Sequence, residues 1–335
     1  MSSGGIIANP ASGRDIRRLV AHASVFNNNE KVNILQRTLL ALDAIGVDRV
    51  SIMPDCYGLG LRAREGLKLG SLQVVVMEMP VTDTERDSAE AAARLSGIGV
   101  GCIVVLGGDG TNRAVAKGCG DTPVVPISTG TNNVFPTMVE GTVAGVAAGM
   151  VATGAVDPEQ VTFRSKRLEV CRDGELVDIA LVDVVTVSDL WVASRAIWDP
   201  ARIREVVLAR AEPCNIGISS VGGCLRTLGD RDDYGMYMAL GPGGMQVLAP
   251  VAPGLVTRVS VRDYRVLPMD QEVTLDSSAA TIALDGEREI EIYDRPSITV
   301  RLTRSGPRVV DISRCMDVAA RSGVLRRSGL PSWRE

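Results

Sequence analysis

One stretch of the chain, residues 102–117, places an apolar strand, a glycine-rich turn and a helix directly one after another. Residues 102–106 (Cys-Ile-Val-Val-Leu) are apolar throughout, which predicts a buried strand of a parallel sheet. Residues 112–117 predict the first turns of a helix that ends at Gly118. Between them lies Gly107-Gly108-Asp109-Gly110-Thr111, called the glycine loop below. A strand, loop and helix in this order are typical of an α/β fold.

The composition of the glycine loop indicates a phosphate-binding site. Glycine at three of its five positions permits positive φ angles and the close approach of another molecule. The following helix directs its free N–H groups toward the same place. Asp109 would repel a phosphate unless it binds Mg²⁺, orients an attacking hydroxyl group or accepts the proton of that group. The alternative is a tight turn that needs glycine for its geometry alone, but such a turn requires neither Asp109 nor Thr111.

Neither of the two common phosphate-binding motifs explains this loop. The chain has no Gly-x-x-x-x-Gly-Lys-Ser/Thr motif, and the spacing of its glycines is not Gly-x-Gly-x-x-Gly. The glycine loop is therefore a different arrangement of residues for the same task.

Strands and helices alternate over residues 5–155, which predicts a Rossmann-like parallel sheet covered on both faces. The expected strands are residues 5–8, 49–53, 73–77, 102–106 and 124–127, and the expected helices are residues 15–23, 30–45, 60–69, 84–96, 112–117 and 140–153. Thr82 and Glu85 have the spacing of a capping box for the helix at 84–96. Gly97 is expected to end that helix in the left-handed conformation.

Three loops follow strands of this sheet directly: residues 9–13 (the first loop), the glycine loop, and residues 128–133 (the third loop). Ligands of open α/β sheets bind at the carboxyl ends of the strands, so the three loops are expected at one edge. The side chains of Asn9 and Ser12 can donate hydrogen bonds to phosphate, although an ordinary Asn-Pro turn is an alternative. The third loop offers a comparable set, with an Asn/Gly turn and a helix cap as its alternative: Thr129, Gly130, Thr131, Asn132 and Asn133.

The pattern changes near residue 157, where short strands replace the strand–helix alternation. Asp173-Gly174 between two strand-like runs is a strong signal of a two-residue hairpin. A helix is expected at residues 201–210, with Asp199 as its cap and Pro200 at its first position. The expected strands are residues 167–172, 175–181, 182–187, 215–219, 236–240, 255–261, 272–276, 281–284, 289–293 and 297–302. This half is predicted to be an antiparallel β-sandwich.

The amino-acid composition excludes several classes of function. A net charge of −4 and 3% aromatic residues argue against nucleic acid, which requires a basic surface with stacking rings. The single histidine, His22, makes a Ser/His/Asp triad or a zinc site with His ligands improbable. The seven cysteines include no Cys-x-x-Cys pair, and most of them are expected to be reduced core residues. No apolar run reaches the roughly 20 residues of a transmembrane helix, and the amino terminus lacks the pattern of a signal peptide, so a cytoplasmic location is expected.

Two acidic residues of the second half are candidates for the site, because the cleft between two domains is the default place for a ligand. Asp285 and Glu287 belong to Asp-Gly-Glu, and in an extended strand their side chains would point to the same side. The alternative is a charged hairpin corner at the surface.

Five motifs together resemble the superfamily that joins NAD kinases to diacylglycerol and sphingosine kinases. The glycine loop is similar to the signature of that superfamily, the first loop to the Asn-Pro-x-Ser-Gly loop of its lipid kinases, and the third loop to their Gly-Thr-Gly-Asn-Asp segment. Residues 249–253 and 284–287 resemble its closing motifs. Within the superfamily the chain is most similar to the ATP-NAD kinase-like proteins of bacterial acetoin catabolism operons.

The resemblance implies an ATP- and Mg²⁺-dependent kinase that phosphorylates a hydroxyl group of a nucleotide or small molecule. It implies that Asp109 acts on the hydroxyl group, that Glu287 corresponds to a glutamate proposed as proton acceptor, and that residues 307–335 return to the first domain. The domains are then residues 1–155, which bind the nucleotide phosphates, and 156–306, which bind the acceptor. NAD kinases carry an Asn-Glu pair where this chain has Val182 and Asp183, which makes Asp183 a candidate for acceptor binding.

Two alternatives remain open from the sequence. One is a non-catalytic nucleotide-binding regulator of a catabolic operon, and the other is a lipid kinase for diacylglycerol or a sphingoid base. The expected partners are a small-molecule or dinucleotide acceptor and, from the habit of the family, a second copy of the chain in a homodimer.

Overall fold

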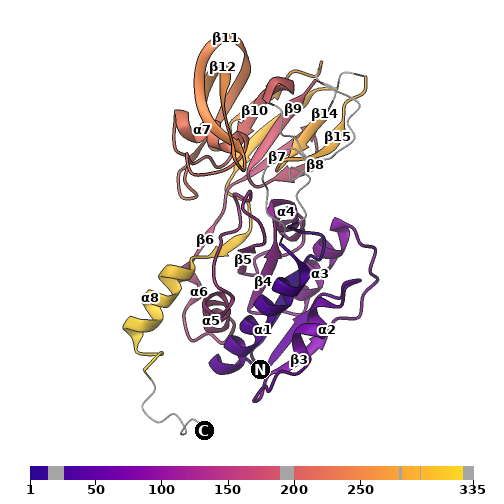
Figure 1. Cartoon of the computed structure of the whole chain (residues 1–335), viewed down its shortest axis with the longest axis vertical. Coiled ribbons are helices and arrows are strands. Elements are labelled where there is room, and N and C mark those ends of the chain that lie inside the picture. Colours follow the sequence, from indigo (N-terminus) through magenta and orange to yellow (C-terminus); the bar gives the residue numbers. More distant parts are fainter. Residues whose placement is uncertain (14–25, 189–199, 279–280, 295, 327–335) are drawn as a thin grey trace.

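The computed structural model describes residues 1–13, 26–188, 200–278, 281–294 and 296–326. The chain forms an elongated molecule in which a half built of helices and a parallel sheet lies at one end and a β-rich half at the other (Figure 1). The predicted helix at residues 15–23, with His22, lies outside the described residues.

The first half is built on a seven-stranded sheet with the order β3-β2-β1-β4-β5-β17-β6. Its first five strands are parallel: β1 Ser3–Ala8, β2 Arg49–Ile52, β3 Gln73–Val76, β4 Cys102–Gly107 and β5 Val124–Ser128. All five correspond to predicted strands. The order 3-2-1-4-5 is that of a doubly wound fold, in which the direction of winding reverses between β1 and β4. The Rossmann-like α/β prediction for this half is confirmed.

Helices cover both faces of this sheet, because its strands are apolar on both sides. On one face α1 and α5 pack over Ile6, Val104 and Leu106, and on the other α3 and α4 pack over Ile7 and Ile103. The helices are α1 Asn28–Ile45, α2 Leu59–Arg64, α3 Glu85–Gly97, α4 Asp109–Ala116, α5 Gly141–Ala152 and the short α6 Pro158–Val161.

The ends of α3 differ from the prediction. Thr84 caps the helix by accepting a hydrogen bond from the N–H of Arg86, so the capping box of Thr82 and Glu85 is wrong. The hydroxyl of Thr82 instead donates to the carboxylate of Asp87, at 2.6 Å. Gly97 still belongs to the helix, and the left-handed residue is Gly99, with φ +72°. Both shifts are about one turn or less, because several neighbouring residues can serve as a cap and tertiary contacts choose among them.

The second half consists of two antiparallel sheets whose facing side chains form one core, which confirms the predicted β-sandwich. The six-stranded sheet contains β12 Leu255–Pro268, β11 Tyr234–Ala252, β10 Ile203–Leu208, β9 Asp183–Val187, β14 Thr281–Leu284 and β15 Glu287–Glu291, in that order. The four-stranded sheet contains β13 Glu272–Leu275, β16 Ile298–Thr303, β7 Arg167–Arg172 and β8 Glu175–Ala180. The predicted hairpin between β7 and β8 is present, with positive φ at both Asp173 and Gly174.

Two predicted elements of this half are wrong. Residues 201–210 do not form a helix: one 3₁₀ turn, η2 Pro200–Arg202, leads into the strand β10. β10 lies between β9 and β11, and its Ile203, Val206 and Val207 are β-branched, so the central position in the sheet overrides the Asp-Pro helix signal. Residues 215–219 do not form a strand, because the chain turns there and begins the helix α7 Ile218–Leu225.

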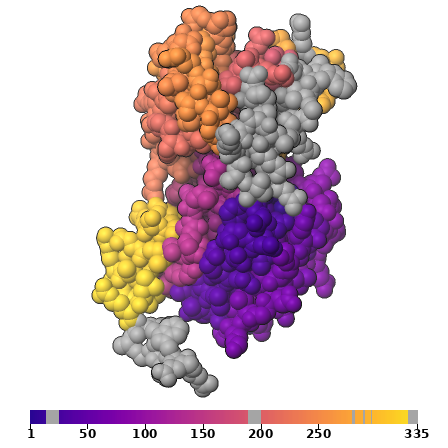
Figure 2. All heavy atoms as spheres, in the orientation of Figure 1, coloured from indigo at the N-terminus to yellow at the C-terminus, as the bar shows by residue number. Residues whose placement is uncertain are grey.

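The chain returns to the first half near its end. β6 Thr162–Arg164 and β17 Arg308–Val310 extend the parallel sheet beyond β5, with β17 parallel to β5 and antiparallel to β6. α8 Ile312–Ser322 then packs beside α5, through the buried Cys315 and Ala319, and lies on the flank of the first half (Figure 2). Among the described residues, no helix has the length and apolarity needed to cross a membrane.

Candidate active site

The three predicted loops meet at one edge of the parallel sheet. The first loop follows β1 and the glycine loop follows β4, which are the two strands at the point where the winding reverses. The side-chain amide of Asn9 donates to the hydroxyl of Thr111 at 2.9 Å, which joins the first loop to the glycine loop. The hydroxyl of Thr129 donates to that of Ser12 at 3.0 Å, which joins the third loop to the first. The structure thus brings together candidates that are more than 100 residues apart in the chain.

A buried lysine holds the first loop from below. Lys31, at the start of α1, is fully buried, and its ammonium group donates to the carbonyl oxygens of Asn9, Pro10 and Ser12 at 2.7–3.0 Å. These bonds keep the loop curved and place a positive charge beneath it. Lys31 was not predicted as a site residue, because a lysine in the first turn of an amphipathic helix is ordinarily exposed.

The glycine loop is more helical than predicted. α4 begins at Asp109, so Asp109, Gly110 and Thr111 form its first turn, and Gly108 caps it without a side chain. A Cβ atom on Gly108 would lie 2.8 Å from the side-chain oxygen of Asn133, and one on Gly107 would lie 2.5 Å from Cβ of Thr111. Gly107 therefore requires glycine because of its close packing against Thr111, whereas at Gly108 the side chain of Asn133 would have to shift. The N–H groups of this first turn are the donors that a phosphate would use.

The carboxylate of Asp109 is held in one orientation. Its Oδ1 accepts from the N–H of Phe135 at 2.7 Å, and both carboxylate oxygens lie 3.1 Å from the N–H of Val134. Asp109 is partly exposed and lies in the wall of a cavity between the two halves. An oriented carboxylate at a cavity wall is the arrangement expected of a residue that acts on a bound hydroxyl group.

Asp285 and Glu287 do not lie on the same side of an extended strand, so that prediction is wrong. Asp285 (φ +52°) and Gly286 (φ +79°) form the two-residue turn between β14 and β15, in which Leu284 pairs with Glu287. Asp285 is buried, and its carboxylate accepts from the N–H groups of Leu181, Val182 and Asp183. Burial raises the pKa of Asp285, while Arg113 and these N–H donors act in the opposite direction.

Glu287 is exposed, and its carboxylate faces the glycine loop. A Cβ atom added to Gly110 would lie 3.5 Å from Oε1 of Glu287. The second half therefore brings the carboxylate of Glu287 to the first turn of α4, while Asp285 of the same β14–β15 hairpin is buried.

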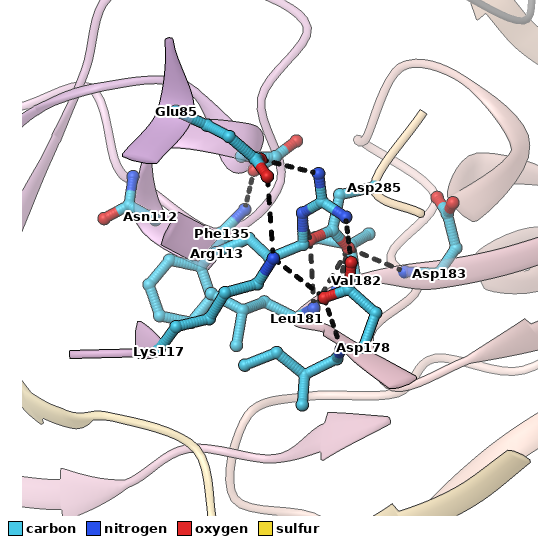
Figure 3. Close-up of polar contacts among 12 residues, drawn as sticks. Glu85, Asn112, Arg113, Lys117, Phe135, Asp178, Leu181, Val182, Asp183 and Asp285 are labelled. Carbon is cyan, nitrogen blue, oxygen red and sulfur yellow. Dashed lines mark hydrogen bonds and ion pairs between the residues drawn. The ribbon is translucent and has the colours of Figure 1, made fainter. Parts of the chain in front are cut away.

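A buried arginine connects the two halves beneath the site (Figure 3). Arg113 lies one turn after Asp109 on α4 and has no exposed surface. Its guanidinium lies 3.3 Å from Glu85 of α3, 3.6 Å from Asp178 of β8 and 4.0 Å from Asp285. Lys117, the residue that caps the end of α4, pairs with Asp178 at 2.8 Å. This cluster could not be predicted from the sequence. The polar face of α4 becomes buried only because the second half packs against it.

A second buried arginine lies close enough to Asp109 to feel its charge. Arg210, just after β10, stacks on the ring of Phe135 at 4.4 Å and pairs with Asp230 at 2.5 Å. Burial lowers the pKa of Arg210, while Asp230 and Asp109 act to raise it. Because the N–H of Phe135 holds Asp109, the contact of Arg210 with the ring fixes the support of that carboxylate.

The remaining candidates lie at different depths. Asn132 and Asp183 are buried and belong to the cavity wall, as does Val182. The side chain of Asn133 donates to Ser128 at 2.8 Å and braces the third loop, while Thr131 is exposed at the tip of that loop and Gly130 is partly exposed. The cavity wall is completed by residues of β9, β10, β11 and the start of α7.

Comparisons with known families cover both halves. Residues 5–155 match the family described as the ATP-NAD kinase N-terminal domain, and residues 166–305 match the acetoin catabolism protein X C-terminal domain. The chain is 40% identical over 341 residues to the acetoin catabolism protein X of Cupriavidus necator, a match that covers 98% of this chain and 95% of that protein.

Solved structures from Bacillus anthracis str. Sterne are also similar. A diacylglycerol kinase structure matches 92% of this chain and 96% of its own, with 11% identity and a TM-score of 0.43. A second structure from the same strain matches 92% and 97%, with 10% identity and a TM-score of 0.46.

Proposed function

This chain belongs to the acetoin catabolism protein X family, with a first domain of the NAD kinase type, and from that premise we propose that it is an ATP-dependent kinase for a hydroxyl compound. One observation carries the proposal. Asp109 lines the cavity from the glycine loop, which is hydrogen-bonded to the first loop, and the first loop is hydrogen-bonded to the third. The first and glycine loops follow the two strands between which the winding of the sheet reverses. Ligands of such sheets bind at this place.

In this proposal the phosphates of ATP lie against the first turn of α4 and the three joined loops. The N–H groups of the glycine loop, the hydroxyl of Thr111 and the side-chain amide of Asn9 are the donors. Ser12 and Thr129, whose hydroxyl groups donate within the loops, hold the loops in place. Lys31 adds positive charge beneath them. For phosphoryl transfer a protein mainly has to position the reactants and neutralise charge. These donors and Lys31 can do both without a histidine.

The chemical step follows from the position of the two carboxylates. The oxygen of the acceptor hydroxyl attacks the γ-phosphorus, the bond from that phosphorus to the bridging oxygen breaks, and ADP leaves with the electron pair. Asp109 accepts the proton of the hydroxyl group. Glu287, whose carboxylate faces Gly110 in the same turn of α4, assists this proton transfer.

The carboxylates also fit the Mg²⁺ ion that such a reaction uses. Among the described residues, no group of three or more His, Cys, Asp or Glu side chains could hold a metal alone. Mg²⁺ that enters with ATP is usually bound through phosphates, water and one or two carboxylates, and Asp109 and Glu287 could provide them. When bound, the ion neutralises charge that develops on the phosphates.

The test is an assay of ATP consumption with a panel of hydroxyl acceptors that includes NAD, acetoin, butanediol, sphingosine and diacylglycerol. Asp109→Asn should lower turnover by about 10² to 10⁴, the usual contribution of a general base. Its melting temperature should change little, because the side-chain oxygen of asparagine can still accept from Phe135. Wild-type turnover in this variant would remove the proposed role of Asp109.

A second candidate is a non-catalytic nucleotide-binding regulator of a catabolic operon. It is favoured by Val182, which lines the cavity and has no amide to bind a dinucleotide. Loss of a buried hydrogen-bond partner costs about 1–3 kcal/mol, or roughly tenfold to a hundredfold in affinity. ATP binding by calorimetry without consumption on any acceptor would support the regulator. Lipid phosphorylation is disfavoured by the carboxylates in the cavity wall.

The same proposal assigns roles to the parts of the chain. Residues 1–155 bind the phosphates, residues 156–306 bind the acceptor and residues 307–326 return to the first domain. We propose that the protein is cytoplasmic and that it forms a homodimer through its β-rich half. Sedimentation analysis would measure the mass of this dimer.

A further inference from the structure

The start of α7 forms part of the wall of the cavity between the two halves. Four consecutive residues line the cavity there: Ile216, Gly217, Ile218 and Ser219. The helix runs from Ile218 to Leu225, and its N-cap residue is Gly217, which has no side chain that could accept hydrogen bonds from the first turn. The N-terminal end of α7 therefore borders the cavity without a side-chain cap.

Two backbone N–H groups at this end have no acceptor within the described part of the chain. The N–H of Gly217 donates to the carbonyl oxygen of Pro250 at 3.0 Å, and the N–H of Ser220 donates to that of Gly217 at 3.1 Å. The N–H groups of Ile218 and Ser219 come between them, and an α-helix offers no acceptor to groups at these positions. The start of α7 thus presents two free donors at the positive end of its helix dipole.

The side chain of Ser219 is a third free donor. Only 1% of the surface of Ser219 is exposed, yet the residue lines the cavity. Its hydroxyl makes no hydrogen bond to any described residue, whereas the hydroxyl of Ser220 donates to the carbonyl oxygens of Gly217 and Pro250, at 2.7 and 3.1 Å. A buried hydroxyl without a partner is costly, so the hydroxyl of Ser219 points to a group that binds there.

Close packing fixes the direction of these donors. A Cβ atom on Gly222 would lie 2.3 Å from Cδ1 of Leu208, and one on Gly223 would lie 2.2 Å from the carbonyl carbon of Glu212. Gly217 has a φ angle of +105°, which residues with a side chain rarely adopt. Because α7 is held this tightly, its free donors are oriented before a ligand arrives, and the entropic cost of binding is lower.

The carboxylates around the cavity do not exclude an anion at α7. Asp285 lies 4.0 Å from Arg113, and the buried Arg210 attracts both Asp285 and Asp109. Asp109 and Asp183 are not without partners either. Cations of the protein therefore neutralise part of the negative charge behind the wall.

We propose that the start of α7 binds an oxyanion, a carboxylate or a phosphate, of the compound whose hydroxyl group is phosphorylated. Three donors at the positive end of a helix form a site that such a group prefers. The role of this ligand as acceptor rests on the proposed function: its anionic group lies at Ser219, its carbon chain contacts the aliphatic Ile216 and Val251, and its hydroxyl is directed toward Asp109. The acceptor is then a hydroxy acid or a phosphorylated alcohol.

The experiment measures binding at α7 directly in the full-length protein. ¹⁵N NMR follows the backbone amides of Ile218 and Ser219 during titration with glycerate, glycerol 3-phosphate and neutral glycerol, which share a three-carbon chain with hydroxyl groups. We expect both amides to shift with at least one of the anions, and this anion to bind about tenfold more tightly than glycerol, or better. The anion that binds more tightly decides between a hydroxy acid and a phosphorylated alcohol. Amide shifts of Gly108 and Gly110 report separately on binding at the glycine loop.

Two variants remove the donors one at a time. Ser219→Ala removes the hydroxyl, and Ile218→Pro removes a backbone N–H at the first position of the helix, where proline is well accommodated. Each should weaken binding of the preferred anion by about tenfold. The controls make the same changes in α8: Ile312→Pro, also at the first position of its helix, and Ser322→Ala at the last. Both controls should leave the affinity unchanged.

The outcomes separate this inference from the kinase proposal. Glycerol that binds as tightly as the anions overturns the inference in the wild type, and so do amides of Ile218 and Ser219 that shift with none of the probes. Unchanged affinity in folded Ser219→Ala and Ile218→Pro also overturns it. Anion binding at α7 without phosphorylation of any acceptor, followed by ³¹P NMR with ATP, leaves the site standing and removes the kinase. Phosphorylation of a neutral acceptor leaves the kinase standing and removes the oxyanion.

Discussion

Three cationic side chains, Lys31, Arg113 and Lys166, are among the largest residues that are fully buried in the described part of the chain. Each has a specific partner: carbonyl oxygens of the first loop for Lys31, carboxylates for Arg113, and the carbonyl oxygen of Tyr234 for Lys166, at 2.9 Å. Burial of a charge is costly unless it is paired and hydrogen-bonded, so these contacts are where substitution should have large effects.

Lys166 predicts a pH dependence of stability. Burial, with nearby Arg210 as the second cause, lowers its pKa from 10.5 to about 8. Below pH 8 lysine is protonated in both the folded and the unfolded chain, and the cost of burying the charge is fully present. Between about pH 8 and 10.5 the unfolded chain binds more protons, so the contribution of Lys166 to stability rises with pH.

Urea unfolding at pH 7.5 and 9.5 measures this effect as the difference between the wild type and Lys166→Met. The wild type should gain about 1–2 kcal/mol relative to the variant over this interval. A difference that does not change with pH would mean that Lys166 titrates at its ordinary value.

At the scale of elements, small residues set how closely the helices approach. α1 and α5 pack against each other through Gly141 and Gly145, and a Cβ on Gly145 would lie 2.8 Å from both Cβ of Ala41 and the carbonyl oxygen of Thr38. The Ala- and Gly-rich sequence of α5 is therefore a packing surface.

Two glycine substitutions should have opposite effects on stability. Gly145→Ala should lower the free energy of unfolding by about 1–3 kcal/mol, because the backbone of α1 must move away. Gly97→Ala, at the exposed end of α3 where nothing lies within 4 Å of the new Cβ, should raise it by about 0.5–1 kcal/mol. Denaturant unfolding of both variants measures the pair, and equal signs would contradict the packing described for α5.

At the scale of the whole molecule, the two halves are joined by the Arg113 cluster next to the site. Arg113 of α4 and Lys117, which caps the end of that helix, lie opposite Asp178 of β8 and Asp285 of the β14–β15 turn. The same helix carries Asp109, so the orientation of the halves and the position of that carboxylate depend on shared contacts.

Arg113→Met should be strongly destabilising, by about 3–5 kcal/mol, because it leaves the buried Asp285 without its cation. The control is Arg94→Met, whose exposed i,i+4 pair with Glu90 should contribute less than about 1 kcal/mol. Thermal and urea unfolding measure both variants. Similar losses in the two would show that the cluster does not stabilise the junction.

Much of the first half was predictable, because its strands are locally apolar and its loops carry their signals in a few consecutive residues. The positions of β1, β4 and β5 and the convergence of their loops follow from the rule that parallel strands end at the same edge. The second half was predictable as a class, and its β7–β8 hairpin by position, since Asp-Gly favours the positive φ angles of that turn.

The sequence alone determined the α/β and antiparallel character of the two halves, the edge where the loops meet and the carboxylate in the glycine loop, because these depend on neighbours within a few residues. Tertiary structure alone decided that residues 203–208 form a central strand, that Lys31 and Arg113 are buried, and that Asp285 turns inward while Glu287 stays exposed. Each of these depends on a surface supplied by a distant segment, and no local pattern specifies which surface that will be.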